Sequence, residues 1–308
     1  MSLYSSWDNF WFRSIDARQF AALRIVFGLF SVIYLCQLLP YVTSQFSDSG
    51  WLGTTRQIAE QSGGSWSLLF LTVGAYIPLF AYVFVGIGIL SAALLMIGWH
   101  SKIAAFICWL VWVSLWNRNP LLFDGDDAIL KIMCWYLMLS PCGNCWSVDT
   151  KLQKRPQFVA VWPLRLVQFQ IALIYFVSGW VKFYSLDWQS GDVIQYVLIH
   201  PHYSRWDGWA FSSEAAIPEI FAGLADFIKW WEVLFPLALI HPLSRKLSLL
   251  IGLMFHLGLF LTMNLRWFPI IMLALYLALI SNCLFKMLEE ALYNLLSSLK
   301  HKNKGEYT

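Results

Sequence analysis

Three ionisable side chains lie in or beside long apolar segments, and their types are those that carry protons in enzymes. Lys182 ends an apolar run that begins at Leu173, Glu232 stands near the start of another, and His256 lies in the middle of a third. Placing such a group in a membrane helix is costly, so each is a candidate functional residue. An amine with little water around it loses its proton readily and can act as a base near neutral pH. We therefore predict that Lys182 is a catalytic base, with Glu232 and His256 tuning it or relaying protons.

Each of these residues also has a structural interpretation. A lysine at the end of a span can extend its amine to the membrane interface. Glu232 could pair with Lys229, three residues earlier, or with Lys182 from the neighbouring segment. A histidine inside a membrane helix often hydrogen-bonds a neighbouring helix, which is the interpretation that residue type alone favours for His256. Pro236 cannot donate to the carbonyl of Glu232, so a kink is expected there.

A second polar set lies between two apolar segments, and it comprises Asn117, Arg118, Asn119, Asp126 and Asp127. The segment resembles a calcium loop only loosely, because it lacks the twelve-residue ladder of ligands and the closing glutamate. An ion pair of Arg118 with Asp126 or Asp127 is the better expectation, since it would fix the loop between two spans. We assign this set, together with Trp188, to substrate binding or to structuring the loop.

No metal site is predicted. Cys142 and Cys145 have the spacing of half a zinc site, but no second pair accompanies them. His200 and His202 flank a proline beside Asp207, and they could bind a metal or remain solvated. Phosphate-binding glycine loops, G-x-S-x-G and H-E-x-x-H are absent from the sequence. Basic residues are spread over several loops, which argues for membrane topology and against nucleic-acid binding.

The composition defines the elements that must position these residues. Of the 308 residues, 59% are hydrophobic and 13% are charged, whereas a soluble domain carries about 25% charged residues. Repeated apolar runs of about 20 residues indicate an all-α, polytopic membrane protein. We predict eight spans, at about 19–39, 68–97, 102–116, 128–141, 163–183, 220–240, 246–264 and 268–285.

Three domains follow from this pattern. Residues 1–18 form an interfacial N-terminal region, in which an amphipathic helix is expected over 4–18. Residues 19–285 form the transmembrane domain. Residues 286–308 form a second interfacial helix, over 286–299, and a cytoplasmic tail. No internal repeat of the kind found in secondary transporters is evident.

The basic residues predict the orientation. With the N-terminus inside, the inner segments hold 14 of the 21 Lys and Arg residues, and the outer loops hold 11 of the 18 Asp and Glu residues. This asymmetry is typical of an even number of spans with both termini in the cytoplasm. Lys182 then faces outward. We expect the cytoplasmic (inner) membrane of a bacterium, with the lipid bilayer as the first partner.

Several short motifs occur in an order that resembles one known family. They are Trp116-Asn117, Cys145-Trp-Ser-Val-Asp149, Gln170-Ile-Ala-Leu-Ile-Tyr175-Phe-Val-Ser-Gly179-Trp-Val-Lys182, Asp187-Trp188, Glu232-x-x-x-Pro236 and Phe255-His256. Together they resemble the vitamin K-dependent gamma-carboxylases and their bacterial relatives, the HTTM proteins. Asp16-Ala-Arg18 and Asp48-Ser-Gly50-Trp51 are similar to the bacterial members. The resemblance covers about residues 10 to 285.

The resemblance implies a specific reaction. In the carboxylases, a lysine at the position of Lys182 deprotonates reduced vitamin K on the luminal side of the membrane. Oxygen then yields a basic alkoxide that takes a proton from a substrate glutamate. An acidic residue on the next helix corresponds to Glu232. The family's histidine after the Trp-Asn pair is replaced near Asn119, and the large soluble substrate domain is not expected here.

Two hypotheses follow. In the first, the chain is an enzyme with an outward-facing pocket for a reduced, vitamin K-like quinone, and it acts on that lipid or on a small secreted peptide. Its partners would be maturation proteins, because it is similar to the sporulation-delaying protein B group. In the second, it is a non-catalytic scaffold or export partner that keeps the fold, and Lys182 and Glu232 form a structural pair.

Overall fold

Helices make up most of the chain in the computed structural model, which describes residues 3–72, 78–206 and 218–280, with 285–287, 290, 291 and 294. The earlier helices are α1 (Leu3–Phe12), α2 (Arg18–Leu38), α3 (Val42–Phe46), α4 (Thr55–Gln61), α5 (Pro78–Ile97), α6 (Ser101–Arg118), α7 (Gly125–Leu139) and α8 (Val148–Leu152). The later ones are α9 (Trp162–Lys182), α10 (Leu186–Ser190), α11 (Val193–Ile199), α12 (Pro218–Ala238), α13 (Pro242–Thr262) and α14 (Phe268–Leu275). Short 3-10 helices are η1 (Leu39–Tyr41), η2 (Leu68–Thr72) and η4 (Tyr276–Ala278).

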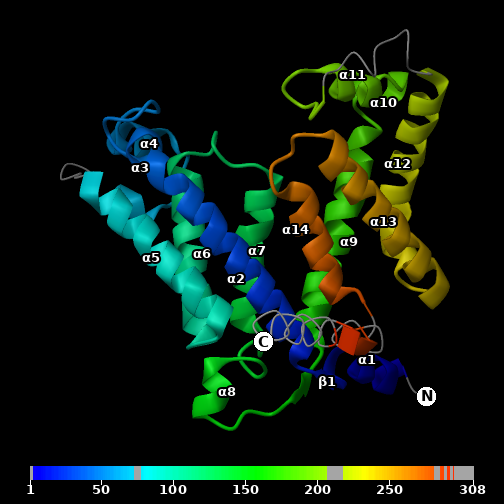
Figure 1. Ribbon diagram of the computed structural model, residues 1–308, viewed down its shortest axis with the longest axis horizontal. Helices are drawn as coiled ribbons and strands as arrows, with labels where there is room; N and C mark the ends of the chain where they lie inside the picture. Colours follow the sequence, from blue (N-terminus) through cyan, green and yellow to red (C-terminus); the bar gives the residue numbers. More distant parts are fainter. Residues whose placement is uncertain are drawn as a thin grey trace, which may run out of the picture.

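The long helices form two neighbouring groups (Figure 1). In one group α2 packs against α5, α5 against α6, and α6 against α7; in the other, α9 packs along α12. Helix α14 joins the groups, because it contacts α2, α7 and α13. The short helices α3, α4, α10 and α11 lie at one end of the molecule, and α1 and α8 lie at the other (Figure 1). Helix α9 therefore runs from the end of the molecule where α1 lies to the end where α10 lies.

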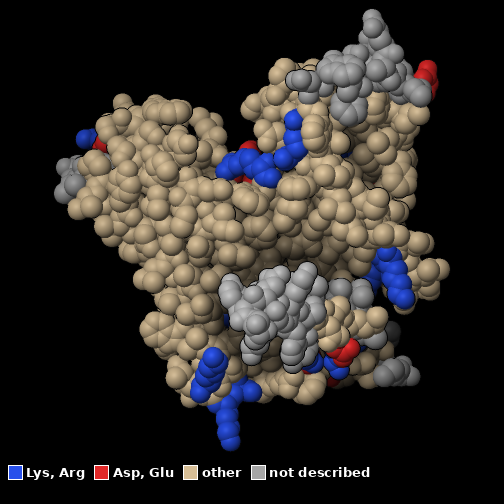
Figure 2. All heavy atoms as spheres, in the orientation of Figure 1, with Lys and Arg blue, Asp and Glu red and all other residues tan. Residues whose placement is uncertain are grey.

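The structure is that of a membrane protein. Within the described residues, four helical stretches are long and apolar enough to cross a bilayer, namely Arg18–Phe46, Pro78–Ile97, Trp162–Lys182 and Pro242–Thr262. Helices α6, α7, α12 and α14 occupy the other four segments in which spans are predicted. Charged side chains gather above and below a broad uncharged band on the face shown in Figure 2. This distribution suits a helical protein surrounded by lipid.

The helix expected over residues 4–18 is shorter than predicted. Helix α1 ends at Phe12, and the chain continues as β1 (Ser14–Asp16), which pairs antiparallel with β2 (Phe158–Ala160). The Asp16 carboxylate accepts the N–H of Arg18 at 3.0 Å and so serves the start of α2. A helix through residue 18 would lose both the strand pairing and this contact. The second interfacial helix, over 286–299, lies mostly outside the described residues.

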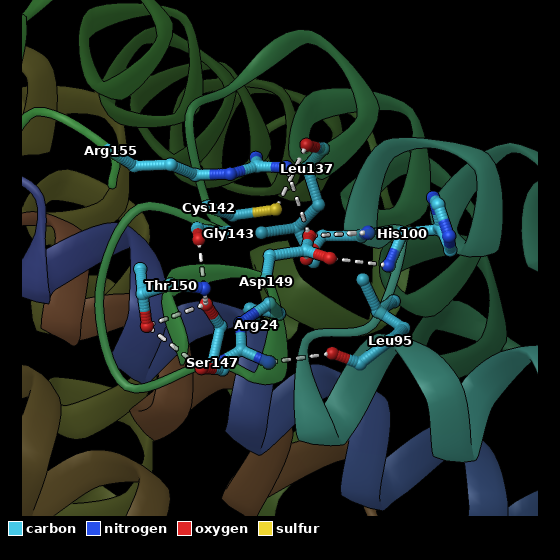
Figure 3. Close-up of polar contacts among 11 residues, drawn as sticks. Arg24, Leu95, His100, Leu137, Cys142, Gly143, Ser147, Asp149, Thr150 and Arg155 are labelled. Carbon is cyan, nitrogen blue, oxygen red and sulfur yellow. Dashed lines mark hydrogen bonds and ion pairs between the residues drawn. The ribbon is translucent and has the colours of Figure 1, made fainter. Parts of the chain in front are cut away.

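A buried arginine holds the turn between α5 and α6. Arg24 is fully buried, and its terminal nitrogens donate to the carbonyl oxygens of Leu95, Met96 and Trp146 at 2.7–2.9 Å. The first two are carbonyls at the end of α5, which have no partner within the helix. The guanidinium therefore closes the end of α5 and ties it to α2 (Figure 3).

Asp149 caps the start of α6, as Arg24 closes the end of α5. Its carboxylate accepts the N–H groups of His100 and Ser101 at 2.8 and 3.2 Å, and the Ser101 hydroxyl at 3.1 Å (Figure 3). Arg155 lies 3.6 Å from the same carboxylate. A negative charge is favourable at a helix N-terminus, because the first N–H groups have no partner within the helix. The aspartate of the Trp-Ser-Val-Asp149 motif thus fixes the α5–α6 hairpin.

The contacts of Asp149 make its contribution to stability depend on pH. Burial alone would raise the pKa of Asp149, but the hydrogen bonds from His100 and Ser101 and the nearby Arg155 outweigh it, so the pKa lies below its usual value. A carboxylate with a lowered pKa stabilises the folded state above its unfolded pKa of about 3.9 and ceases to do so as the pH falls through the folded value.

We predict that Asp149→Asn destabilises the protein at pH 7 by about 1–3 kcal/mol, because buried N–H groups lose their charged acceptor. Thermal unfolding in detergent, followed by circular dichroism between pH 7 and pH 3, tests this. The difference from wild type should shrink below about pH 3.9. Asp187→Asn, at an exposed carboxylate in α10, is the control. An equal difference at every pH would contradict the assignment.

Candidate functional site

Lys182 is the last residue of α9, and its amine lies between two helices. It forms an ion pair with the Glu232 carboxylate of α12 and donates to the Ser178 hydroxyl at 2.9 Å. The amine also lies 4.8 Å from the centre of the Trp188 ring, within range of a cation–π contact. The Lys182 side chain is 16% exposed and that of Glu232 is 4% exposed. The pair is therefore largely shielded from water.

Close contact between α9 and α12 brings the Lys182 amine and the Glu232 carboxylate within reach of each other. A Cβ atom placed on Gly179 would lie 2.7 Å from both the Cβ of Glu232 and the backbone nitrogen of Val233. Any other residue at this position would therefore hold the two helices apart. Gly179 lies three residues before Lys182, on the same side of α9. The glycine allows the approach that brings the carboxylate to the amine.

Lys229, the alternative partner for Glu232, is engaged elsewhere. Its amine pairs with Asp226 at 2.6 Å and donates to the carbonyl of Trp188 at 3.0 Å. Lys229 thereby anchors the segment after α9, which contains Trp188, onto α12. Of the two partners that the sequence offers for Glu232, the structure uses Lys182.

His256 belongs to a buried chain of three polar rings. Its side chain is 1% exposed, and its Nε2 atom lies 2.7 Å from the Tyr175 hydroxyl, which lies 2.6 Å from the Tyr276 hydroxyl. Gly252 makes room for this chain, because a Cβ there would collide with the Tyr276 hydroxyl. His256 thus hydrogen-bonds Tyr175 of the neighbouring helix α9, the kind of contact that its residue type favours.

Tyr175 was not singled out from the sequence, although a signal was present. It stands four residues before Gly179 and seven before Lys182, a spacing that places all three on one face of a helix. Tyr276 gave no such signal, because its segment is uniformly apolar and the hydroxyl meets its partner only through tertiary packing.

A cavity of about 880 Å³ joins these groups. Lys182, Glu232 and Ser178 line it, as do Trp188, Tyr175 and His256. The rest of the lining is mainly apolar and comes from α11, α12, α13 and α14. The volume is in the upper part of the range of about 300–1,000 Å³ that is usual for small-molecule sites. Lys182, Glu232, His256 and Trp188 thus share one pocket.

The polar set between α6 and α7 lies apart from this cavity. Asn117 donates to the carbonyl of Trp66 at 2.6 Å, and Asn119 to that of Gln45 at 3.2 Å. Arg118 is buried and donates to the carbonyls of Ser47 and Gly53, both at 3.0 Å. These donors bind the backbone of α3 and of the loops that precede α4 and η2.

Asp126 and Asp127 are both buried at the start of α7. Asp127 accepts the N–H of Asp124 at 2.8 Å, which caps the helix. Arg266, from the turn between α13 and α14, lies 3.8 Å from the carboxylates of Asp124 and Asp127. This cation therefore ties the turn before α14 to the first group of helices.

Side chains that could bind a metal are dispersed in the described part of the chain. The residues placed there contain no cluster of three or more His, Cys, Asp or Glu side chains that could hold a metal ion. Cys142 is buried and Cys145 is partly exposed. His200 and His202 are neighbours in the segment that follows α11, while Asp207 lies outside the described residues.

The helices, the lipid-facing composition and the shared pocket define a polytopic helical membrane protein with one amphipathic cavity. The model of the HTTM domain family matches residues 12–285. The chain therefore belongs to the HTTM domain family, a membrane family related to the carboxylases. No solved structure matches the chain.

We predict that Gly179→Ala destabilises the protein by about 1–3 kcal/mol, because the added methyl group pushes α12 away and stretches the Lys182–Glu232 pair. Thermal unfolding in detergent measures this change. The matched control is Gly223→Ala on α12, where an added Cβ meets nothing within 4 Å. Equal stability of the two variants would mean that α9 and α12 are not in close contact.

Proposed function

We propose that this HTTM protein binds a reduced quinone of the vitamin K type in its cavity and that Lys182 takes a proton from it. The observation that carries the proposal is the Lys182–Glu232 pair in the lining of a mainly apolar cavity. A quinol has a hydroxylated ring and an apolar tail, so it matches both parts of this lining. A bound quinol supplies a hydroxyl whose anion reacts with oxygen to give a strong base.

The pair itself provides the route for the proton. In an apolar setting, the Lys182 ammonium can pass a proton to the Glu232 carboxylate that it contacts, which leaves a neutral amine. Nζ then accepts the hydroxyl proton of the quinol and becomes an ammonium again. This cation balances the negative charge left on the ligand, and the Trp188 ring stabilises it from the side.

His256 and the two tyrosines form the second element of the mechanism. The chain Tyr276–Tyr175–His256 is continuous in hydrogen bonds and lines the same cavity at Tyr175 and His256. A tyrosine hydroxyl can both donate and accept, so the Tyr175 hydroxyl, which contacts both neighbours, can pass a proton between them without water. We assign it to relaying protons and to holding the polar end of the cavity in place.

The proposal includes a membrane orientation. The chain would have about eight spans, with α6, α7, α12 and α14 completing the bilayer domain, and with both termini in the cytoplasm of a bacterium. The excess of basic residues in the predicted inner segments supports this orientation. Lys182 then lies at the outer end of α9, at the end of the molecule opposite α1 (Figure 1).

An outer pocket suits a secreted substrate. We propose that the modified partner is a small secreted peptide, delivered with the help of maturation proteins as in the sporulation-delaying protein B group. The peptide would meet the site from the side of α10 and α11. Lys182, Glu232 and His256 are the proposed catalytic residues, and Trp188 is the proposed substrate contact.

One observation favours the non-catalytic alternative. The Lys182 amine already has a carboxylate, a hydroxyl and an aromatic ring around it. Such a full set of partners is also what a structural ion pair between α9 and α12 would have. In that case the chain is a scaffold or export partner, and the pair only holds the two helices together.

We predict that quinone co-purifies with the wild-type protein, and that Lys182→Ala reduces this amount while Lys182→Arg retains it. Arginine preserves the positive charge beside Glu232 but cannot give up its proton. Lys182→Arg should therefore lose at least about tenfold in the rate of quinol consumption in air, while its thermal stability stays close to that of wild type. Mass spectrometry of extracted lipids and absorbance of the oxidised quinone measure the two properties.

Two outcomes would overturn the catalytic proposal. A full rate in Lys182→Arg would remove Lys182 as the base. Ordinary phospholipid without quinone in the wild-type protein, together with a lower unfolding temperature in Lys182→Ala and Glu232→Gln, would establish the structural pair. Folding of each variant is checked by gel filtration before either measurement.

A further inference from the structure

Three arginines meet where the end of α1 approaches the starts of α9 and α13. Arg13 directly follows α1, Arg165 is the fourth residue of α9, and Arg245 is the fourth residue of α13. The N–H of Val161 donates to the carbonyl of Arg13 at 3.1 Å, and Nε of Arg165 donates to the carbonyl of Phe10 at 3.4 Å. The charges of Arg13 and Arg245 both act on the guanidinium of Arg165. We call these three residues the arginine cluster.

The arginine cluster lacks a balancing negative charge in the described part of the chain. None of its members belongs to an ion pair there, and Asp8, the carboxylate of α1, forms none with them. Both charges that act on Arg165 are positive and repel it. Like charges held together destabilise a fold unless an anion offsets their repulsion. We therefore expect the cluster to recruit an anion.

Two of the guanidinium groups are held in place by the backbone and still have donors to offer. Nη1 of Arg165 donates to the Gln168 side chain at 2.8 Å. Nε and Nη2 of Arg245 donate to the carbonyl of Leu239 at 3.1 and 2.7 Å. Among the residues that the structure places, Nη2 of Arg165 and Nη1 of Arg245 have no acceptor. A fixed guanidinium with spare N–H groups suits the oxygens of a phosphate.

The arginine cluster lies at the level of one membrane surface. Helices α9 and α13 are both long and apolar enough to cross a bilayer, and the fourth residue of a helix lies only about 4.5 Å from its start. Helix α1, at the same end of the molecule (Figure 1), exposes the aromatic rings of Tyr4, Trp7 and Phe12. Such rings settle among lipid headgroups. An anion at this depth is most readily supplied by the lipid itself.

We propose that the arginine cluster binds the anionic phosphate headgroup of a phospholipid whose acyl chains stay in the surrounding bilayer. Basic pockets at the ends of membrane helices recognise such headgroups. The bound phosphate would join α1, α9 and the turn between α12 and α13 through one ligand. None of the three arginines lines the cavity that contains Lys182, so this site is independent of the proposed function.

The experiment titrates the full chain in detergent with phosphatidylglycerol, or with phosphatidylcholine that carries the same acyl chains, and counts bound lipid by native mass spectrometry. We expect phosphatidylglycerol to bind the wild-type protein at least about tenfold more tightly. Arg13→Gln should lower that affinity about fivefold, the effect of one basic residue beside an anionic headgroup. Arg13→Glu should lower it further, and Arg13→Lys should retain it. Arg13 is suited to this test because its side chain is exposed and makes no hydrogen bond within the described residues.

The matched control is Lys151→Gln on α8, which removes one exposed positive charge at the same end of the molecule (Figure 1). Lys151 is not among the charges that act on Arg165, so phosphatidylglycerol should bind this variant as it binds wild type. An equal loss in Lys151→Gln and Arg13→Gln would mean general attraction to a basic surface and would refute the site. Equal affinity of the wild-type protein for the two lipids would also refute it.

A further titration distinguishes a lipid from a soluble phosphate compound. Glycerol 3-phosphate carries the phosphate without acyl chains, and we expect it to bind the wild-type protein at least about tenfold more weakly than phosphatidylglycerol. If it binds as tightly, and Arg13→Gln weakens both to the same extent, the ligand is a soluble phosphate and the lipid assignment is wrong.

Discussion

The pocket depends on a cation and an anion held against each other between two apolar helices. Either charge alone would be strongly unfavourable there, because lipid and buried protein replace little of the hydration that a free ion has in water. The contact between Lys182 and Glu232 offsets that cost, and Gly179 permits it by letting α9 and α12 approach. Trp188, held onto α12 by Lys229, completes the surroundings of the amine.

The same physical constraint produces a different result at the end of the molecule where α8 lies. Arg24 and Asp149 are also buried, yet their partners are the carbonyl and N–H groups at the ends of α5 and α6. Unpaired backbone groups are costly in or near lipid, so the protein uses fixed charges to complete helix ends. Lys182 and Arg24 are both cations shielded from water in apolar helices. They differ in position, because Lys182 lies beside a cavity.

Sequence reasoning is most informative where the cost of burying a residue can be read from its own segment. A lysine, a glutamate and a histidine in apolar segments stand out by type alone, and all three line one pocket. It could not choose between Lys182 and Lys229 as the partner of Glu232, because spacing along one helix says nothing of what the next helix presents. It also expected Arg118 to pair with Asp126 or Asp127, whereas the ion pair to Asp127 comes from Arg266, which is distant in sequence.

The sequence by itself determined that the chain is a helical membrane protein and which ionisable side chains are candidates, because hydropathy and the cost of burying charge are properties of short segments. The sequence also showed the resemblance to the HTTM proteins over most of the chain. Only the tertiary structure decided that α9, α11, α12, α13 and α14 line one cavity and that Tyr175 and Tyr276 join His256. These features depend on distances between helices, which arise from packing at residues such as Gly179 and Gly252 and have no counterpart in a local pattern.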